Sequence, residues 1–164
     1  MKIKKNLSTI DAIILSDYIL LRYGPMSHLK LQKLLFYCDA YHLAYFNKPL
    51  VNDEFEAWVH GPVLRRVYDE LKDKSKLYAE LSFDKDVREI EVQFSILTQS
   101  QQDLIADVLS NLAEWSEFQL EAATHREKPW MEARIGYAPG DKCNIHISKE
   151  TTRDFYKSEI NASN

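Results

Sequence analysis

Residues 29–72, LKLQKLLFYCDAYHLAYFNKPLVNDEFEAWVHGPVLRRVYDELK, carry the strongest pattern in the chain and decide its fold. From Ser27 to Phe46, apolar side chains recur three or four positions apart, which is the spacing of one face of a helix. The residues of this stripe are Leu31, Leu34, Leu35, Cys38, Tyr41, His42 and Tyr45. Further apolar side chains widen the stripe on both sides, and a helix this apolar is typical of the centre of a small core. Asn47-Lys48-Pro49 ends the helix because proline cannot continue it.

A strand and a second helix are expected next. Over residues 53–59 apolar and polar side chains alternate, which predicts a strand with one buried face. Gly61-Pro62 ends this strand. Because the fixed φ of proline suits the first position of a helix, we predict a helix from Pro62 to about Lys74, with Arg65 and Arg66 on its solvated face.

The segments on either side of this stretch add helices and one more strand. Residues 8–23 predict a helix that Ser8 caps and that Gly24-Pro25 ends. Residues 89–96 again alternate between apolar and polar, so we predict a strand there that pairs with the strand at 54–59. Two strands alone are only marginally stable, and this element is therefore expected to lie against helices.

The C-terminal third is read as helical. Positions 98 and 116 hold Thr and Ser, each followed three residues later by Gln, and this capping-box pattern predicts two helix starts. Pro129-Trp130 predicts a further turn of helix, Ser148 caps a last helix, and a polar tail from about Ser158 is expected to fray. The whole pattern predicts a mainly α fold: one compact helical domain over residues 1–164 with a small two-stranded antiparallel β element.

Composition narrows the class of protein. The chain has 164 residues, of which 45% are apolar and 12% aromatic, enough for a core and too many for a disordered protein. A net charge of −4 disfavours nucleic acid as a partner. No apolar run approaches the ~20 residues of a membrane span, and no signal peptide is recognised. The two cysteines, Cys38 and Cys143, form no disulfide pattern, so a cytoplasmic location is expected.

Motifs for catalysis or metal binding are missing from the sequence. Four glycines in the whole chain form no phosphate-binding loop, and the five histidines show no metal-ligand spacing. Cys38 and His42 are four residues apart, but both belong to the core stripe. We therefore expect no cofactor, no metal and no enzyme activity. The alternative is a hydrolase in which His60, His125 and carboxylates near Trp58 converge on one concave pocket.

Five residues are candidates for contact with a partner protein, and each has a purely structural alternative. Gln32 and Lys33 flank the core stripe, where they either contact a partner or form hydrogen bonds to a neighbouring loop. Trp58 is either half-buried or an exposed anchor. His60 precedes a Gly-Pro that either binds an anion at a helix start or is only a turn. Arg65 either contacts a partner or lies on a solvated helix face.

The order of several short motifs resembles the Panacea domain of SocA-like antitoxins, a family also described as phage-associated proteins. The matching residues are Leu31-Gln32-Lys33-Leu34-Leu35-Phe36-Tyr37, Ala40-Tyr41, Lys48-Pro49-Leu50, Glu56-Ala57-Trp58, Gly61-Pro62-Val63, Tyr68, Thr124-His125, Pro129-Trp130 and Ile147-Ser148. The resemblance covers most of the chain. It implies a mostly helical fold with a small strand element, and no catalytic residues.

The resemblance also implies a function, an antitoxin that binds a toxin encoded beside it and blocks it by direct contact. Two alternatives remain: an adaptor that delivers the toxin to a protease, and a phage-associated protein of unassigned role. A homodimer is also left open. Because this chain is mildly acidic, a basic toxin would suit it. Nine motif residues are expected to be structural: Leu31, Leu34, Tyr41, Ala57, Gly61, Pro62, His125, Pro129 and Trp130.

Overall fold

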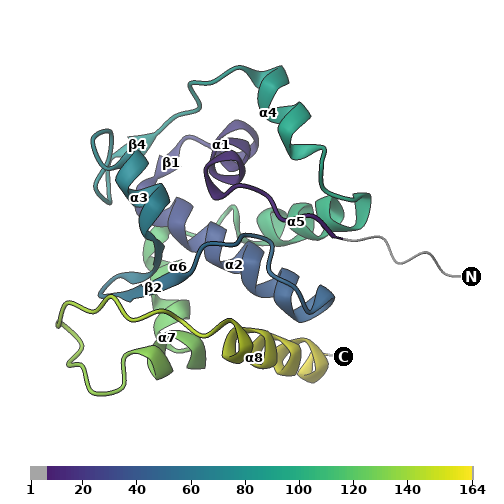
Figure 1. Ribbon diagram of the computed structural model, residues 1–164. Coiled ribbons are helices and arrows are strands. Elements are labelled where there is room, and N and C mark those ends of the chain that lie inside the picture. The colour runs from purple at the N-terminus through teal and green to yellow at the C-terminus, as the bar shows by residue number, and fades with distance from the viewer. Residues whose placement is uncertain (1–6, 164) are drawn as a thin grey trace, which may run out of the picture.

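A computed structural model describes residues 7–163 and confirms the mainly α class (Figure 1). Within these residues the helices are α1 (Ala12–Tyr23), α2 (His28–Phe46), α3 (Arg65–Leu71), α4 (Val87–Phe94), α5 (Gln99–Leu112), α6 (Glu117–His125), α7 (Lys128–Ala133) and α8 (Lys149–Ala162). The strands are β1 (Met26–Ser27), β2 (Phe55–Trp58), β3 (Gly61–Leu64) and β4 (Glu80–Leu81). None of the helices described is long and apolar enough to cross a membrane.

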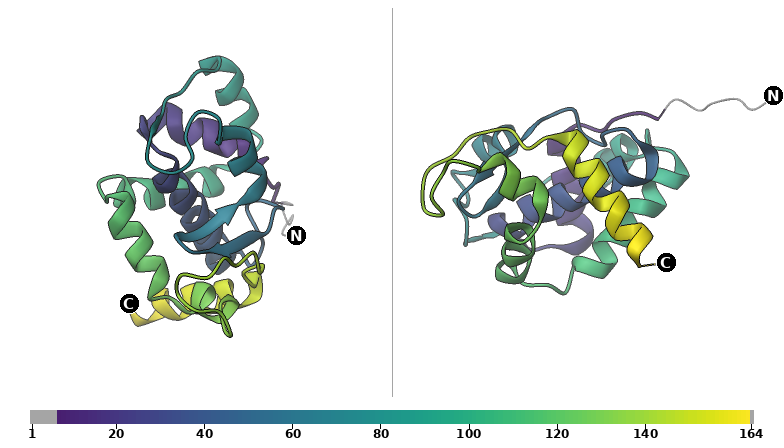
Figure 2. Two further views of the ribbon diagram at one scale, coloured as in Figure 1. Left: turned by 90° about the vertical axis from the view of Figure 1, so that its left-hand side faces the viewer. Right: turned by 90° about the horizontal axis from the view of Figure 1, so that it is seen from below.

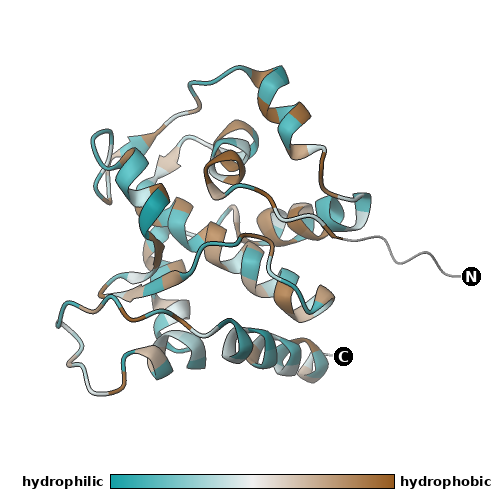
Figure 3. Ribbon diagram, viewed as in Figure 1, coloured by the Kyte–Doolittle hydropathy of each residue, from teal (hydrophilic) through white to brown (hydrophobic). Residues whose placement is uncertain are grey.

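Helix α2 is the centre of the molecule, as its wide apolar stripe predicts. Fifteen of its 19 residues are buried. It contacts α1, α5, α6, α8 and β3, and Figures 1 and 2 show it lying between α1 and α8. Helix α1 is mostly hydrophobic, whereas α8 is mostly hydrophilic and is anchored by Tyr156, which is 1% exposed (Figure 3). The later elements therefore pack around one buried helix.

The β element differs from the prediction in its second strand. β2 pairs with β3 in an antiparallel hairpin, with Phe55 opposite Leu64 and Trp58 opposite Gly61. The predicted helix start at Pro62 is wrong, because Pro62 lies in β3 and α3 begins at Arg65. A proline is tolerated in a strand at the edge of a sheet. The other edge of β2 is covered by residues 145–147, since Ala57 N–H donates to the Ile145 carbonyl at 2.9 Å.

The predicted strand at 89–96 is also wrong, because these residues form α4. Ile90 and Phe94 are four residues apart and are both buried, whereas Val92 is 59% exposed. Asp86 caps the helix by accepting a hydrogen bond from Glu89 N–H at 2.9 Å. Phe94 stacks on Tyr18 with ring centroids 3.6 Å apart. The short alternation of apolar and polar residues also fits a strand. The buried pair Ile90 and Phe94, at helical spacing, and the Asp86 cap instead favour the helix that forms.

The predicted helix ends are mostly confirmed. Both capping boxes are present at the starts of α5 and α6, and Ser148 caps α8. Two predictions are wrong. Asp11, not Ser8, caps α1, with its carboxylate accepting from Ile13 N–H at 2.8 Å. Helix α8 continues to Ala162, through the tail that was expected to fray.

Candidate partner-binding surfaces

Gln32 and Lys33 lie in the interior, out of reach of a partner. They are 1% and 0% exposed. The Gln32 Oε1 accepts a hydrogen bond from Leu64 N–H at 2.9 Å, and the Lys33 ammonium donates to the Pro62 carbonyl at 2.8 Å. Both side chains therefore hold strand β3 against α2. Of the two roles considered for Gln32 and Lys33, these contacts match hydrogen bonding to a neighbouring segment of the chain.

Gly61 is fitted closely around the Lys33 side chain. Its φ is +106°, a conformation that favours glycine. A Cβ atom at this position would lie 2.4 Å from Lys33 Cε and 2.9 Å from the Thr124 hydroxyl oxygen. Burial lowers the pKa of Lys33 to about 7, although the nearby Glu121 opposes this shift. The turn of the hairpin thus depends on a glycine and a buried lysine.

Trp58 and Arg65 share one carboxylate on the outer side of the hairpin. The Arg65 guanidinium donates two hydrogen bonds of 2.9 Å to Glu56, and the Trp58 indole N–H donates a third at 3.0 Å. The guanidinium also lies 5.2 Å from the centre of the Trp58 ring. Burial alone would raise the pKa of Glu56, but these hydrogen bonds hold it below its ordinary value. The two candidate residues are therefore held in place by a charge of the protein itself.

His60 continues this surface towards α6. Its Nδ1 lies 2.6 Å from a carboxylate oxygen of Glu121. Tyr78 lies 6.5 Å from the His60 ring and 6.1 Å from Phe118, measured between ring centroids. Tyr78 and Phe118 are 54% and 59% exposed, and sequence reasoning singled out neither. Trp58, His60, Arg65, Tyr78 and Phe118 are called the hairpin face below.

Trp130, which follows Pro129 in the first turn of α7, packs against the same hairpin. The Trp130 indole N–H donates to the Trp58 carbonyl at 2.8 Å, and His125 stacks on Trp130 at 4.0 Å between ring centroids. Burial lowers the pKa of His125, and its Nε2 is buried without a hydrogen-bond partner among residues 7–163. His125 and Trp130 therefore pack against the hairpin.

The histidines of the hydrolase alternative, His60 and His125, are each already in contact with another side chain of the protein. His60 and Glu121 are paired at 2.6 Å, and the Lys33 ammonium beside them is fully buried. The His125 ring is covered by Trp130. Burial raises the pKa of the Cys38 thiol. No group of three or more His, Cys, Asp or Glu within the described residues is arranged to hold a metal.

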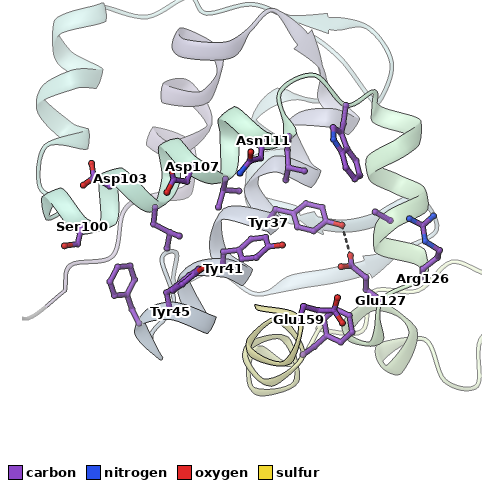
Figure 4. A pocket seen from close by; sticks show the side chains of 17 residues that line it. Tyr37, Tyr41, Tyr45, Ser100, Asp103, Asp107, Asn111, Arg126, Glu127 and Glu159 are labelled. Carbon is purple, nitrogen blue, oxygen red and sulfur yellow. Dashed lines mark hydrogen bonds between the residues drawn. The ribbon is translucent and has the colours of Figure 1, made fainter. Parts of the chain in front are cut away.

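A groove of about 1090 Å³ opens between α2, α5, α6 and α8, and none of the residues that line it belongs to the hairpin face (Figure 4). Its floor is formed by Tyr37, Tyr41 and Tyr45, four residues apart on α2. We call it the tyrosine groove. Its α5 wall carries Leu104, Val108 and Leu112 beside Asp103, Asp107 and Asn111. Its other side carries Phe155 and Glu159 of α8, and Trp115, Arg126 and Glu127 lie at one end.

Tyr37 and Glu127 are joined by a short hydrogen bond at the floor of the tyrosine groove. The Tyr37 hydroxyl donates to Glu127 Oε1 at 2.6 Å, as Figure 4 shows. Burial raises the pKa of Glu127, although this hydrogen bond lowers it. Sequence reasoning assigned Tyr41 and Tyr45 to the core stripe, yet Tyr45 is 55% exposed. The spacing of the three tyrosines places them on one face of the helix, but no signal in the sequence shows that part of this face is open.

Comparison with known proteins identifies the family. The model of the family "Antitoxin SocA-like, Panacea domain" matches residues 31–131, more than half of the chain. Antitoxin SocA of Caulobacter vibrioides (strain NA1000 / CB15N) is 50% identical over 44 residues, which are 27% of this chain and 23% of SocA. The chain thus aligns with about a quarter of that relative. No solved structure matches. The resemblance read from the sequence is confirmed, and the chain belongs to the SocA-like Panacea domain family of antitoxins.

Proposed function

We propose that this protein is an antitoxin that neutralises a cognate toxin by binding to it directly, without catalysis. The observation that carries this proposal is the match of residues 31–131 to an antitoxin family. The toxin's own surface would be covered in a complex of fixed stoichiometry. We expect the toxin to be encoded by a neighbouring gene and both proteins to lie in the cytoplasm.

The hairpin face is a suitable surface for such a contact. Exposed aromatic and arginine side chains dominate the affinity of many protein interfaces. Arg65 is already oriented by Glu56, and His60 by Glu121, so little side-chain entropy is lost on binding. Tyr78 and Phe118 add exposed apolar area beside them. We therefore propose Trp58, His60 and Arg65 as contacts with the toxin, and we no longer propose the buried Gln32 and Lys33.

Co-expression with each flanking reading frame tests the proposal. We expect one neighbour to stop growth when expressed alone, to be tolerated with this protein, and to co-purify with it in a stable complex. The variant Trp58→Ala should weaken retention of the toxin, whereas Tyr137→Ala, which removes a 40% exposed aromatic ring outside both the hairpin face and the tyrosine groove, should leave retention unchanged. Unchanged retention by Trp58→Ala would remove the hairpin face as a contact.

Two other results would change the proposed mechanism. If the toxin is tolerated but disappears faster and forms no stable complex, the protein is an adaptor that delivers it to a protease. If no flanking gene is toxic or none of the products binds, the proposed antitoxin function is wrong. A complex that forms only between two copies of this chain would indicate a homodimer.

A further inference from the structure

The tyrosine groove is long enough to hold a segment of polypeptide chain. Its volume of about 1090 Å³ is above the usual range of small-molecule pockets, which is about 300–1,000 Å³. From Leu104 to Leu112, its α5 wall spans eight residues, about 12 Å at the helical rise. That length accommodates two turns of a helix laid between α5 and α8. A helix of a partner is commonly bound in such grooves between helices.

Apolar side chains extend along the whole groove. The Lys30 ammonium near the start of α2 donates to the Ala113 carbonyl after the end of α5, so the two helices run in opposite directions. Tyr45 therefore lies at one end of the groove and Trp115 at the other. They are 55% and 39% exposed. Aromatic rings exposed at both ends provide anchor points for the apolar side of a bound segment.

The charges of the groove are acidic and are not neutralised by the protein. Four carboxylates, from Asp103, Asp107, Glu127 and Glu159, line it against one cation, Arg126. None of the four forms an ion pair with a cation in residues 7–163. Asp103 accepts only a hydrogen bond from Gln99, at 2.8 Å. The groove thus offers negative charge that a positively charged partner can neutralise.

Other carboxylates of the protein show the contrast. Asp39 is paired with Lys149 at 2.9 Å, and Asp53 with Arg66 at 2.9 Å. These two carboxylates are already neutralised within the protein, so they offer no free negative charge to a partner. The unpaired carboxylates of the groove also disfavour nucleic acid as its occupant, because they would repel the phosphates.

We propose that the tyrosine groove binds a basic, amphipathic helical segment of the toxin, with its apolar side on the tyrosines and its Lys or Arg side chains against Asp103, Asp107 and Glu159. This inference rests on the proposed function, because it names the part of the toxin that the antitoxin recognises. It adds a second contact, separate from the hairpin face.

Charge reversal in the groove tests the proposal with the purified product of the toxic neighbouring gene as the probe. The double variant Asp103→Lys/Asp107→Lys changes two exposed residues of α5 and should raise the dissociation constant tenfold or more at low salt. The matched control is Asp73→Lys/Glu89→Lys, which makes the same change of net charge at two exposed acidic residues outside the groove. It should bind the toxin as the wild type does.

Milder variants and a cross-link keep the test decisive. If the double reversal does not fold, Asp103→Asn/Asp107→Asn keeps the shape of both side chains and should still weaken binding several-fold. Replacing Tyr45 by the photo-crosslinking analogue benzoylphenylalanine should attach the groove to one toxin peptide. We expect that peptide to carry a net positive charge and apolar residues at helical spacing.

The outcomes separate this inference from the proposed function. If the wild type binds the toxin and the groove variants bind equally well, the groove proposal is overturned and the antitoxin function stands. A neutral or acidic cross-linked peptide, or one from a second copy of this chain, also overturns it. If the wild type binds no neighbouring product, the proposed function fails and this inference fails with it.

Discussion

The hairpin face and the tyrosine groove both expose aromatic rings beside charged groups, but they differ in how those charges are balanced. On the hairpin face, Arg65 is paired with Glu56 and His60 with Glu121. In the groove, Asp107 and Glu159 form no ion pair with any cation of residues 7–163. A charge that is already paired positions its side chain, whereas an unpaired charge attracts an opposite charge of the partner. We therefore expect shape to dominate at the hairpin face and charge at the groove.

The two regions also differ in what supports them. The groove floor is α2 itself, a regular helix. The hairpin face is supported from behind by the buried Gln32 and Lys33, which bind the backbone of β3. Changes beneath the hairpin should therefore cost more stability than changes in the groove.

Gly61→Ala should have the largest effect. The new methyl group would lie 2.4 Å from Lys33 Cε, at a φ of +106° that alanine rarely adopts. Backbone strain and overpacking together should lower the free energy of unfolding by about 2–5 kcal/mol. Urea denaturation followed by circular dichroism measures this loss.

Gly136→Ala is the matched control, because Gly136 also has a positive φ, +92°, but has no atom within 4 Å of a new Cβ. It should lose about 1–2 kcal/mol from backbone strain alone. Equal losses in the two variants would mean that the close contact with Lys33 adds nothing to the stability of the hairpin.

The buried Lys33 beneath the hairpin should make the free energy of unfolding depend on pH. Burial lowers its pKa in the folded protein to about 7, whereas the unfolded chain holds the proton up to about pH 10.4. Between these values the unfolded state binds more protons, so the contribution of Lys33 to stability rises with pH and is lost as pH falls towards 7. The wild type should gain about 1 kcal/mol per pH unit relative to Lys33→Met from pH 7.5 to 8.5.

Lys72→Met provides the control for this series, because the Lys72 side chain, directly after α3, is 48% exposed. Its stability curve should run parallel to that of the wild type over the same pH range. Thermal unfolding at several pH values measures all three proteins. A parallel curve for Lys33→Met would show that the buried ammonium keeps its ordinary proton affinity.

The sequence was sufficient to predict the frame that supports the hairpin. The stripe on α2, the Pro49 stop and the capping boxes are local signals, and the helix ends that they predict are confirmed. The second strand was assigned to residues 89–96 because alternation does not show which residues pair. The second strand is instead the adjacent segment β3, which pairs locally with β2, with Trp58 opposite Gly61 across a turn of two residues.

The groove could not be predicted from the sequence by the same means. Tyr41 and Tyr45 follow the helical spacing of buried residues, and spacing cannot show where neighbouring helices stop covering a face. Only the positions of α5 and α8 leave Tyr45 exposed. In the same way, Lys33 is a polar flank in the sequence, and burial follows only from the fit of β3 and Gly61 around it.

Arg65→Ala should have the smallest effect and should separate the two regions by their response to salt. The Arg65 side chain is 51% exposed, so losing its ion pair with Glu56 should lower the free energy of unfolding by less than about 1 kcal/mol. Because this charge is already neutralised by Glu56, the loss of toxin affinity should change little between low and high salt.

The loss caused by Asp103→Lys/Asp107→Lys should instead be largest at low salt, where unpaired charges are least screened. Arg66→Ala, a neighbouring arginine paired with Asp53 outside the hairpin face, should leave affinity unchanged. Titration of the toxin at two salt concentrations measures these losses, and a strong salt dependence for Arg65→Ala would mean that its charge acts on the partner rather than on Glu56.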